Sequence, residues 1–284
     1  MPHAHHTSVE SLWISLALSL VALVYLRQWL RFAWLVPDGV KGWRACSFFV
    51  GLFLVWVGLG SPLSLLDHDL LTVHMVQHLL LMTLAPPLIL LGAPFELLPQ
   101  HPVQGLVEPV AKLHPAVGWI GATAALVVWH VPGMLILGLR SEMWHGIEQA
   151  SFLVAGLLFW WPVVEPSQHA SKWPESSILL YLFLATLPCD ILSGFLVFCD
   201  RVVYPVYSSS PRQFGMTALE DQQCAGALMW TCVTIVYLIA GAVFAARLLA
   251  PRWSPDDLIP QSQSQAIVMT HEAAHREGQR LEVV

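Results

Sequence analysis

Two histidines in an apolar segment, His74 and His78, are the residues with the clearest capacity for chemistry in this chain. Residues four apart lie on the same face of a helix, so these imidazoles can bind one metal ion together or contribute to two. Imidazole suits copper, zinc, iron and nickel, whereas thioether favours copper(I). Met75 and Met82 flank the pair, although a methionine in such a segment is more often a packing residue than a ligand. The spacing therefore predicts a metal site.

Three other side chains with metal-binding chemistry lie at the ends of later apolar segments. His130 stands near the end of one segment, and His145 and Glu148 stand at the beginning of the next. A single histidine in an apolar segment is more often a hydrogen-bonded structural residue than a ligand. Several polar groups that converge from different segments indicate a shared binding site. The predicted metal ligands are His74, His78, His130, His145 and Glu148.

The motifs that would make these histidines part of an enzyme are missing. A zinc protease needs His-Glu-x-x-His with the glutamate as general base, and Met75 stands at the position of that glutamate. Covalent c-type haem needs Cys-x-x-Cys-His, which this sequence lacks, as it lacks a P-loop. Haem b stays open as the alternative cofactor, but its axial ligands approach from opposite faces, so His74 and His78 can supply only one of them.

The elements that position these residues are membrane-spanning helices. Of the 284 residues, 56% are hydrophobic and 11% are charged, whereas a soluble domain has about 25% charged residues. The mean hydropathy is +0.63. Apolar runs of about 20 residues cross a bilayer, and they must be helical because open sheet edges cannot be satisfied in lipid. The predicted fold is an all-α polytopic membrane helix bundle with seven transmembrane helices, namely Ser11–Arg31, Trp43–Gly60, Leu70–Leu91, Ala116–Leu139, Ile147–Val164, Ser177–Cys199 and Gln222–Leu249.

Basic residues orient these helices. Of the 13 lysines and arginines, all but three lie on one side of the membrane, the side that has the loop after the first span and the C-terminus. The three on the opposite side are Arg140, Arg201 and Arg212. Cytoplasmic loops carry the excess of Lys and Arg, so the N-terminus is predicted outside and the C-terminus in the cytoplasm. The predicted organisation is a short outer segment, 1–10, the seven-helix domain, 11–250, and a polar, disordered tail, 251–284. The five predicted ligands then share one depth in the outer third of the membrane.

Charge and cysteine usage limit the other functions. The net charge of −6 is diffuse, and no basic surface for nucleic acid is predicted. The five cysteines show no Cys-x-x-Cys spacing. Cys199 and Cys224 both fall near the outer face and could pair there, although buried free thiols are the usual state.

The motifs resemble the Bacillus-type CtaG family of cytochrome c oxidase assembly factors, in order from about Trp43 to Leu249. They are His74-Met75-Val76-Gln77-His78-Leu79-Leu80-Leu81-Met82, Ala85-Pro86-Pro87, Leu91-Gly92-Ala93-Pro94, Trp129-His130-Val131-Pro132, His145 with Glu148, Ser151-Phe152-Leu153, Gly156-Leu157-Leu158-Phe159-Trp160-Trp161-Pro162, Tyr181-Leu182-Phe183, Asp200-Arg201, Tyr204-Pro205, Asp221-Gln222-Gln223, Gly226 and Met229-Trp230. One departure concerns residue 149, where the family often has a second histidine after the glutamate and this chain has Gln149. An amide is a poor copper ligand, so a site that used that histidine would be weakened or rebuilt here.

The resemblance implies a membrane-embedded copper-handling factor that helps to mature a haem–copper oxidase and is not an enzyme. The implied step is supply or insertion of copper, as copper(I), at the copper B centre, which histidines hold within the membrane toward its outer side. The implied partners are the catalytic subunit of cytochrome c oxidase, periplasmic copper chaperones and the lipid bilayer, and the implied location is the bacterial cell membrane. Two alternatives stay open, namely a haem-binding or electron-transfer membrane protein and a copper-uptake or copper-resistance permease.

Overall fold

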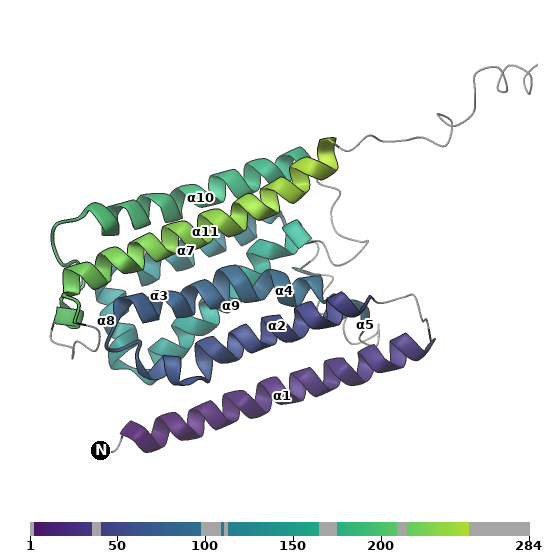
Figure 1. The fold of residues 1–284 in the computed structure, drawn as a ribbon, viewed down its shortest axis with the longest axis horizontal. Helices are drawn as coiled ribbons and strands as arrows, with labels where there is room; N and C mark the ends of the chain where they lie inside the picture. The colour runs from purple at the N-terminus through teal and green to yellow at the C-terminus, as the bar shows by residue number, and fades with distance from the viewer. Residues whose placement is uncertain are drawn as a thin grey trace, which may run out of the picture. The chain divides into compact units, whose positions relative to one another are not determined.

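The structure is a computed structural model that describes residues 3–35, 41–97, 109–110, 113–164, 175–208 and 215–249. Within these ranges the regular elements are helices and no strand occurs, so the predicted all-α fold is confirmed (Figure 1). One compact unit comprises Met1–Phe244 and contains all the residues of the candidate site, and Ala245–Val284 form a second unit. Helix α1 begins at His3, within the predicted outer segment 1–10, and the predicted tail 251–284 lies outside the described residues.

Six helical stretches of the described chain are long and apolar enough to cross a membrane, and a bent pair raises this number to seven if it counts as one span. The elements in chain order are α1 (His3–Leu35), α2 (Gly42–Leu59), the 3-10 helix η1 (Pro62–Leu65), α3 (Leu71–Leu79), the π-helical turn η2 (Leu80–Leu84), α4 (Ala85–Leu91), α5 (Pro94–Leu97), α7 (Pro115–Trp129), α8 (Pro132–Arg140), α9 (Glu142–Val164), α10 (Glu175–Phe198), the 3-10 helix η3 (Pro205–Ser208) and α11 (Ala218–Leu249). Helix α3, turn η2 and helix α4 run on as one span, Leu71–Leu91.

The expected fourth span, Ala116–Leu139, is not one straight helix. Helices α7 and α8 meet at an angle of 79°. Pro132 is the cause, because a proline disfavours helical backbone in the residue before it, and Val131 is accordingly extended with ψ 127°. The bend directs α8 back along α9. A Cβ atom added at Gly138 of α8 would lie 2.6 Å from Oε2 of Glu148, so α8 packs directly against that carboxylate.

Two prolines explain the π-helical turn in the span that carries His74 and His78. Pro86 and Pro87 have no N–H to donate, so carbonyl groups in the preceding turn lose their usual helical partners. The N–H of Ala85 donates to the carbonyl of Leu80, one residue further back than in an α-helix. Nε1 of Trp160 in α9 donates to the carbonyl of Met82 at 3.2 Å. The prolines therefore create the irregular turn, and a tryptophan of the next layer satisfies part of it.

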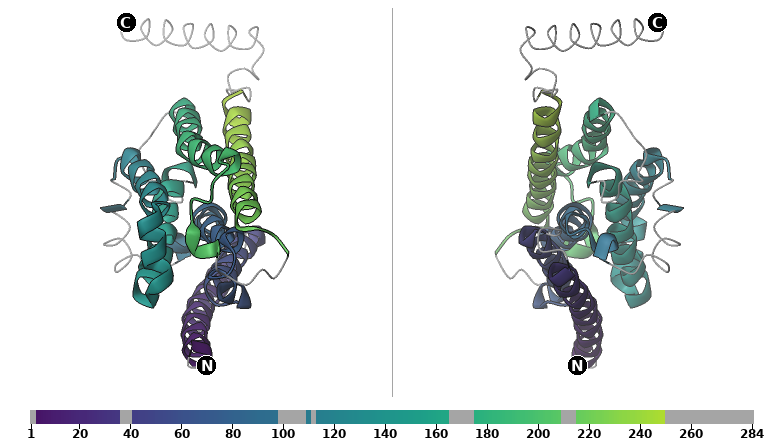
Figure 2. Two further views of the ribbon diagram at one scale, coloured as in Figure 1. Left: turned by 90° about the vertical axis from the view of Figure 1, so that its left-hand side faces the viewer. Right: turned by 90° about the vertical axis from the view of Figure 1, so that its right-hand side faces the viewer.

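The span Leu71–Leu91 lies among α2, α9 and α11 (Figure 2). Glycine makes its approach to α9 possible, because a Cβ atom at Gly156 would lie 2.6 Å from the carbonyl oxygen of Met82. Such close crossings of small residues are typical of membrane helices. At the other end of the span, the buried carboxylate of Asp221 in α11 accepts hydrogen bonds from the N–H groups of Leu71 and Thr72 at 2.8 and 3.0 Å. Asp221 thus caps the first turn of the helix that carries the histidine pair.

Candidate metal centre

Helices α3 and α9 bring the predicted ligands face to face. His74 and His78 lie one turn apart on α3, with ring centroids separated by 4.3 Å. His145 and Glu148 lie on the first turns of α9, spaced so that both side chains point to the same side. The ring of His145 lies 5.9 Å from that of His74. Four of the five predicted side chains, those of His74, His78, His145 and Glu148, therefore form one cluster.

Glu148 lies at the centre of this cluster. Its Oε1 atom is 3.4 Å from Nε2 of His74 and also 3.4 Å from Nε2 of His78. Its Oε2 atom is 3.4 Å from Nδ1 of His145. The side chains of His74 and Glu148 are fully buried, whereas that of His145 is 16% exposed. A single carboxylate thus touches three imidazoles in a buried setting that opens at His145.

Asp67 completes the cluster and was not among the predicted ligands. It lies in the segment between α2 and α3, is fully buried, and places Oδ2 3.1 Å from Nε2 of His145. Burial raises the pKa of Asp67, but His145, His68 and His74 lower it further, so that the pKa lies below its ordinary value. Asp67 is therefore a carboxylate, able to bind a cation. Its place three residues before the third predicted span, next to His68, was the signal in the sequence.

The ligand-capable atoms form two overlapping groups among the described residues. Asp67, His74 and His145 make one, and His74, His78 and Glu148 make the other, with the atoms of each group within 4.8 Å of one another. Both ring nitrogens of His74 and of His78 and both carboxylate oxygens of Glu148 are buried without a hydrogen-bond partner. An unpaired buried polar group costs about 1–3 kcal/mol, so such a concentration fits residues that bind a cation. We name this set, Asp67, His74, His78, His145 and Glu148, the histidine–carboxylate cluster.

His130 lies beyond this cluster, on the other side of His78. Its ring centroid is 6.1 Å from that of His78. Its Nδ1 atom is 2.7 Å from the carbonyl oxygen of Leu126, and its Nε2 atom is 3.2 Å from the sulfur of Met75. His130 is the C-cap residue of α7 and stands directly before the bend to α8.

The side chain of Gln149 contacts the histidine–carboxylate cluster, although an amide is a poor metal ligand. Its side-chain nitrogen is 2.8 Å from Nε2 of His145. A histidine at this position would therefore have its ring beside the same imidazole.

Two buried tyrosines of the segment between α10 and α11 hold the backbone around the site. The hydroxyl of Tyr204 donates to the carbonyl of His130 at 2.9 Å, and that of Tyr207 donates to the carbonyl of Asp67 at 3.0 Å. Burial raises the pKa of Tyr204 to about 12 and that of Tyr207 well above its ordinary value. Both hydroxyls therefore remain donors at any physiological pH and keep Asp67 and His130 in place.

The cysteines do not belong to the ligand-capable groups of the cluster. All five, Cys199 and Cys224 included, are free thiols, so the pairing considered from the sequence does not occur.

Comparison with known proteins gives one match. A family model described as cytochrome c oxidase caa3 assembly factor (Caa3_CtaG) matches residues 23–250. A search of curated proteins and a search of solved structures each returned no match. The matched range contains every residue of the histidine–carboxylate cluster and agrees with the resemblance seen in the sequence.

Proposed function

Because the chain belongs to the Caa3_CtaG family of cytochrome c oxidase caa3 assembly factors, we propose that it supplies copper to the copper B centre of the oxidase. The proposed donor is the histidine–carboxylate cluster, with His130 as an additional ligand outside it. One observation carries the proposal, namely that Glu148 touches three imidazoles in a buried site where both of its oxygens and both ring nitrogens of His74 and His78 lack hydrogen-bond partners. Copper analysis of the purified protein tests it.

The chemistry of the cluster supports transfer of an ion and not catalysis. Imidazole ligands suit copper and zinc, and the ligand-capable groups found together among the described residues are histidine, aspartate and glutamate, without a cysteine. The proposed acceptor is a centre held by histidines within the membrane. Ligand exchange between buried imidazoles would move copper between the two proteins without hydrating it. An oxidase assembly factor that hands over copper in this way is not an enzyme.

The size of the adjoining cavity favours copper over haem b. The cavity beside His78 and His130 has a volume of about 50 Å³. Such a space suits an ion or a water molecule, since one water in the liquid occupies about 30 Å³. A bound organic molecule of drug size requires a pocket of about 300–1,000 Å³. The cavity that two histidines border is therefore too small for a porphyrin.

A labelling experiment tests the proposed orientation in the bacterial cell membrane. His68 and Lys41 are both exposed and lie beyond opposite ends of α2. On a cysteine-free background, a membrane-impermeant maleimide added to intact cells should modify H68C and spare K41C. Lysed cells serve as the control, in which both positions should react. Modification of K41C alone in intact cells would reverse the topology and put the cluster at the cytoplasmic side.

Adding the missing histidine should strengthen the proposed site. Gln149 contacts His145, so a Gln149→His variant would place a further imidazole at the cluster. We expect copper affinity to rise by about tenfold or more, as partners of metal ligands change affinity by about 10–100-fold. Competition with a chromophoric copper chelator measures the change. Gln149→Leu, which offers no ligand, is the matched control. Equal affinities of the histidine and leucine variants would place residue 149 outside the site.

A further inference from the structure

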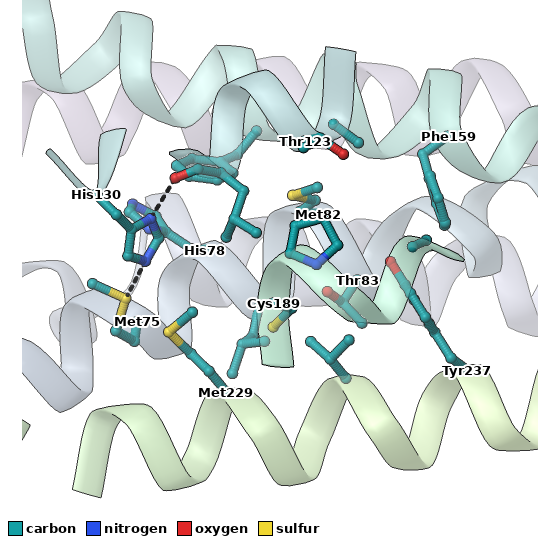
Figure 3. A pocket seen from close by; sticks show the side chains of 17 residues that line it. Met75, His78, Met82, Thr83, Thr123, His130, Phe159, Cys189, Met229 and Tyr237 are labelled. Atoms are coloured by element: carbon teal, nitrogen blue, oxygen red, sulfur yellow. Dashed lines mark hydrogen bonds between the residues drawn. The ribbon is translucent and has the colours of Figure 1, made fainter. Parts of the chain in front are cut away.

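A second group of metal-binding side chains lies next to the histidine–carboxylate cluster and differs from it in ligand type. The cavity of about 50 Å³ is lined by His78, His130, three methionines and one cysteine, and the rest of its lining is apolar except for two threonines and a tyrosine. Figure 3 shows these sulfur-bearing side chains around the cavity, with Met75 in contact with His130. They are Met75, Met82, Cys189 and Met229. They come from α3, η2, α10 and α11, which lie apart in the chain.

The contact between His130 and Met75 is the feature that points to a cation. The carbonyl oxygen of Leu126, 2.7 Å from Nδ1, fixes the proton of the neutral ring on that nitrogen. Nε2 then presents a lone pair to the sulfur of Met75, which lies at 3.2 Å and is itself an acceptor. Two lone pairs that face each other in a buried site repel unless a cation lies between or beside them.

The ligand types indicate which cation that is. Thioether and thiol ligands select copper(I), whereas carboxylates suit harder ions. The cavity lining has sulfur and imidazole but no carboxylate. The histidine–carboxylate cluster has Asp67 and Glu148 but no sulfur. Two neighbouring groups of side chains therefore differ in the hardness of the cation that their ligand types favour, and His78 belongs to both groups.

A row of imidazoles connects the cavity with the exposed end of the protein. The side chain of His68 is 53% exposed, and its ring lies 5.9 Å from that of His145. The next separations are 5.9 Å from His145 to His74, 4.3 Å from His74 to His78, and 6.1 Å from His78 to His130. Each ring is thus within reach of the next, and an ion can pass along them by ligand exchange.

We propose that Met75 and His130 bind a copper(I) ion at this cavity, with Met229 and Cys189 as further sulfur ligands. This soft site is distinct from the histidine–carboxylate cluster and forms the inner end of the imidazole row. The proposal rests on the proposed copper function. It adds a second binding position for copper and assigns the oxidation state copper(I) to the ion bound there.

X-ray absorption of the full-length protein loaded with copper(I) under reducing conditions tests the soft site. Wild-type protein should show sulfur as well as nitrogen around copper. A Met75→Leu, Met229→Leu variant should lose most of the sulfur signal and bind one copper fewer per chain. Leucine keeps the volume and apolarity of methionine, so the packing survives. Met143→Leu is the matched control, because Met143 is 65% exposed and lies outside the cavity.

The outcomes separate this proposal from the proposed function. An unchanged sulfur signal and copper-to-protein ratio in the methionine double variant would refute the soft site while leaving the cluster intact. Retained nitrogen-bound copper in that variant shows that the protein is folded. Absence of all copper binding in the wild-type protein would refute the proposed function as well. Loss of sulfur in the Met143→Leu control would place the sulfur ligand elsewhere and also contradict the soft site.

Discussion

A His74→Ala, Glu148→Gln double variant is expected to lose copper binding at the histidine–carboxylate cluster by more than about 100-fold in affinity, since even partners of metal ligands change affinity by about 10–100-fold. His74 belongs to both overlapping groups of ligand-capable atoms, and Glu148 touches three imidazoles. The protein should still insert into the membrane. Copper titration of the purified variant measures the loss, and cells that carry it should lose oxidase activity.

The thermal stability of the same variant separates a metal site from a structural hydrogen-bond network. Both ring nitrogens of His74 and both oxygens of Glu148 lack hydrogen-bond partners, so their removal should cost the metal-free protein little beyond the cavity that the imidazole leaves. Copper should raise the Tm of the wild type by more than that of the variant, which keeps only the sulfur-lined cavity, because a ligand at about 100 times its Kd stabilises by about 2.7 kcal/mol. His114→Ala is the control for the copper-induced shift in Tm, since exposed His114 caps α7 away from the cluster and loss of its cap lowers the Tm equally with and without copper. A marked loss of stability without metal would return His74 and Glu148 to a structural role.

Cells that lack this protein are expected to make the oxidase polypeptides and to lose nearly all oxidase activity. The physical reason is that the copper B centre would remain without its ion. Added copper should restore part of the activity, because mass action replaces a donor when the acceptor site binds tightly. The measurement is a deletion strain grown with graded copper, with oxidase activity, haem spectra and copper content determined on the same membranes.

The alternatives predict different results in that strain. A haem-delivery role would remove the high-spin haem signal of the catalytic subunit, and copper would not help. A copper-uptake or resistance permease would change the copper content of the whole cell. Full oxidase activity in the deletion strain without added copper would contradict the assembly role.

Apolar length was sufficient to predict most of the fold. The spans expected from runs of about 20 apolar residues all fall on helices, because in lipid a helix is the structure that satisfies its own backbone, although α1 and α9 begin eight and five residues before the expected positions. The fourth span was expected as one helix but is broken into α7 and α8, since hydropathy does not register the bend that Pro132 imposes at Val131. Pro132 itself was the available signal. The capping of α3 by Asp221, 150 residues away along the chain, is a tertiary contact that no local pattern contains.

The site was predicted only in part, because local spacing can be read from the sequence whereas tertiary contacts cannot. Helical spacing places His74 and His78 on one face, and depth matching brings His145 and Glu148 to them. Depth alone does not specify lateral position, so His130 was expected in the cluster but lies 6.1 Å beyond His78 and contacts Met75. Asp67 was missed because it precedes the span, and its burial depends on the fold of the segment before α3.

The most direct test of the central claim is the metal content of the full-length protein purified without chelators, beside that of the His74→Ala, Glu148→Gln variant. If the histidine–carboxylate cluster is the copper donor, the wild type contains stoichiometric copper and shows no Soret band, and the variant loses the copper that nitrogen and oxygen ligands hold. The same copper-to-protein ratio and ligand signature in both proteins would contradict it, and so would a wild-type protein that contains haem and no copper.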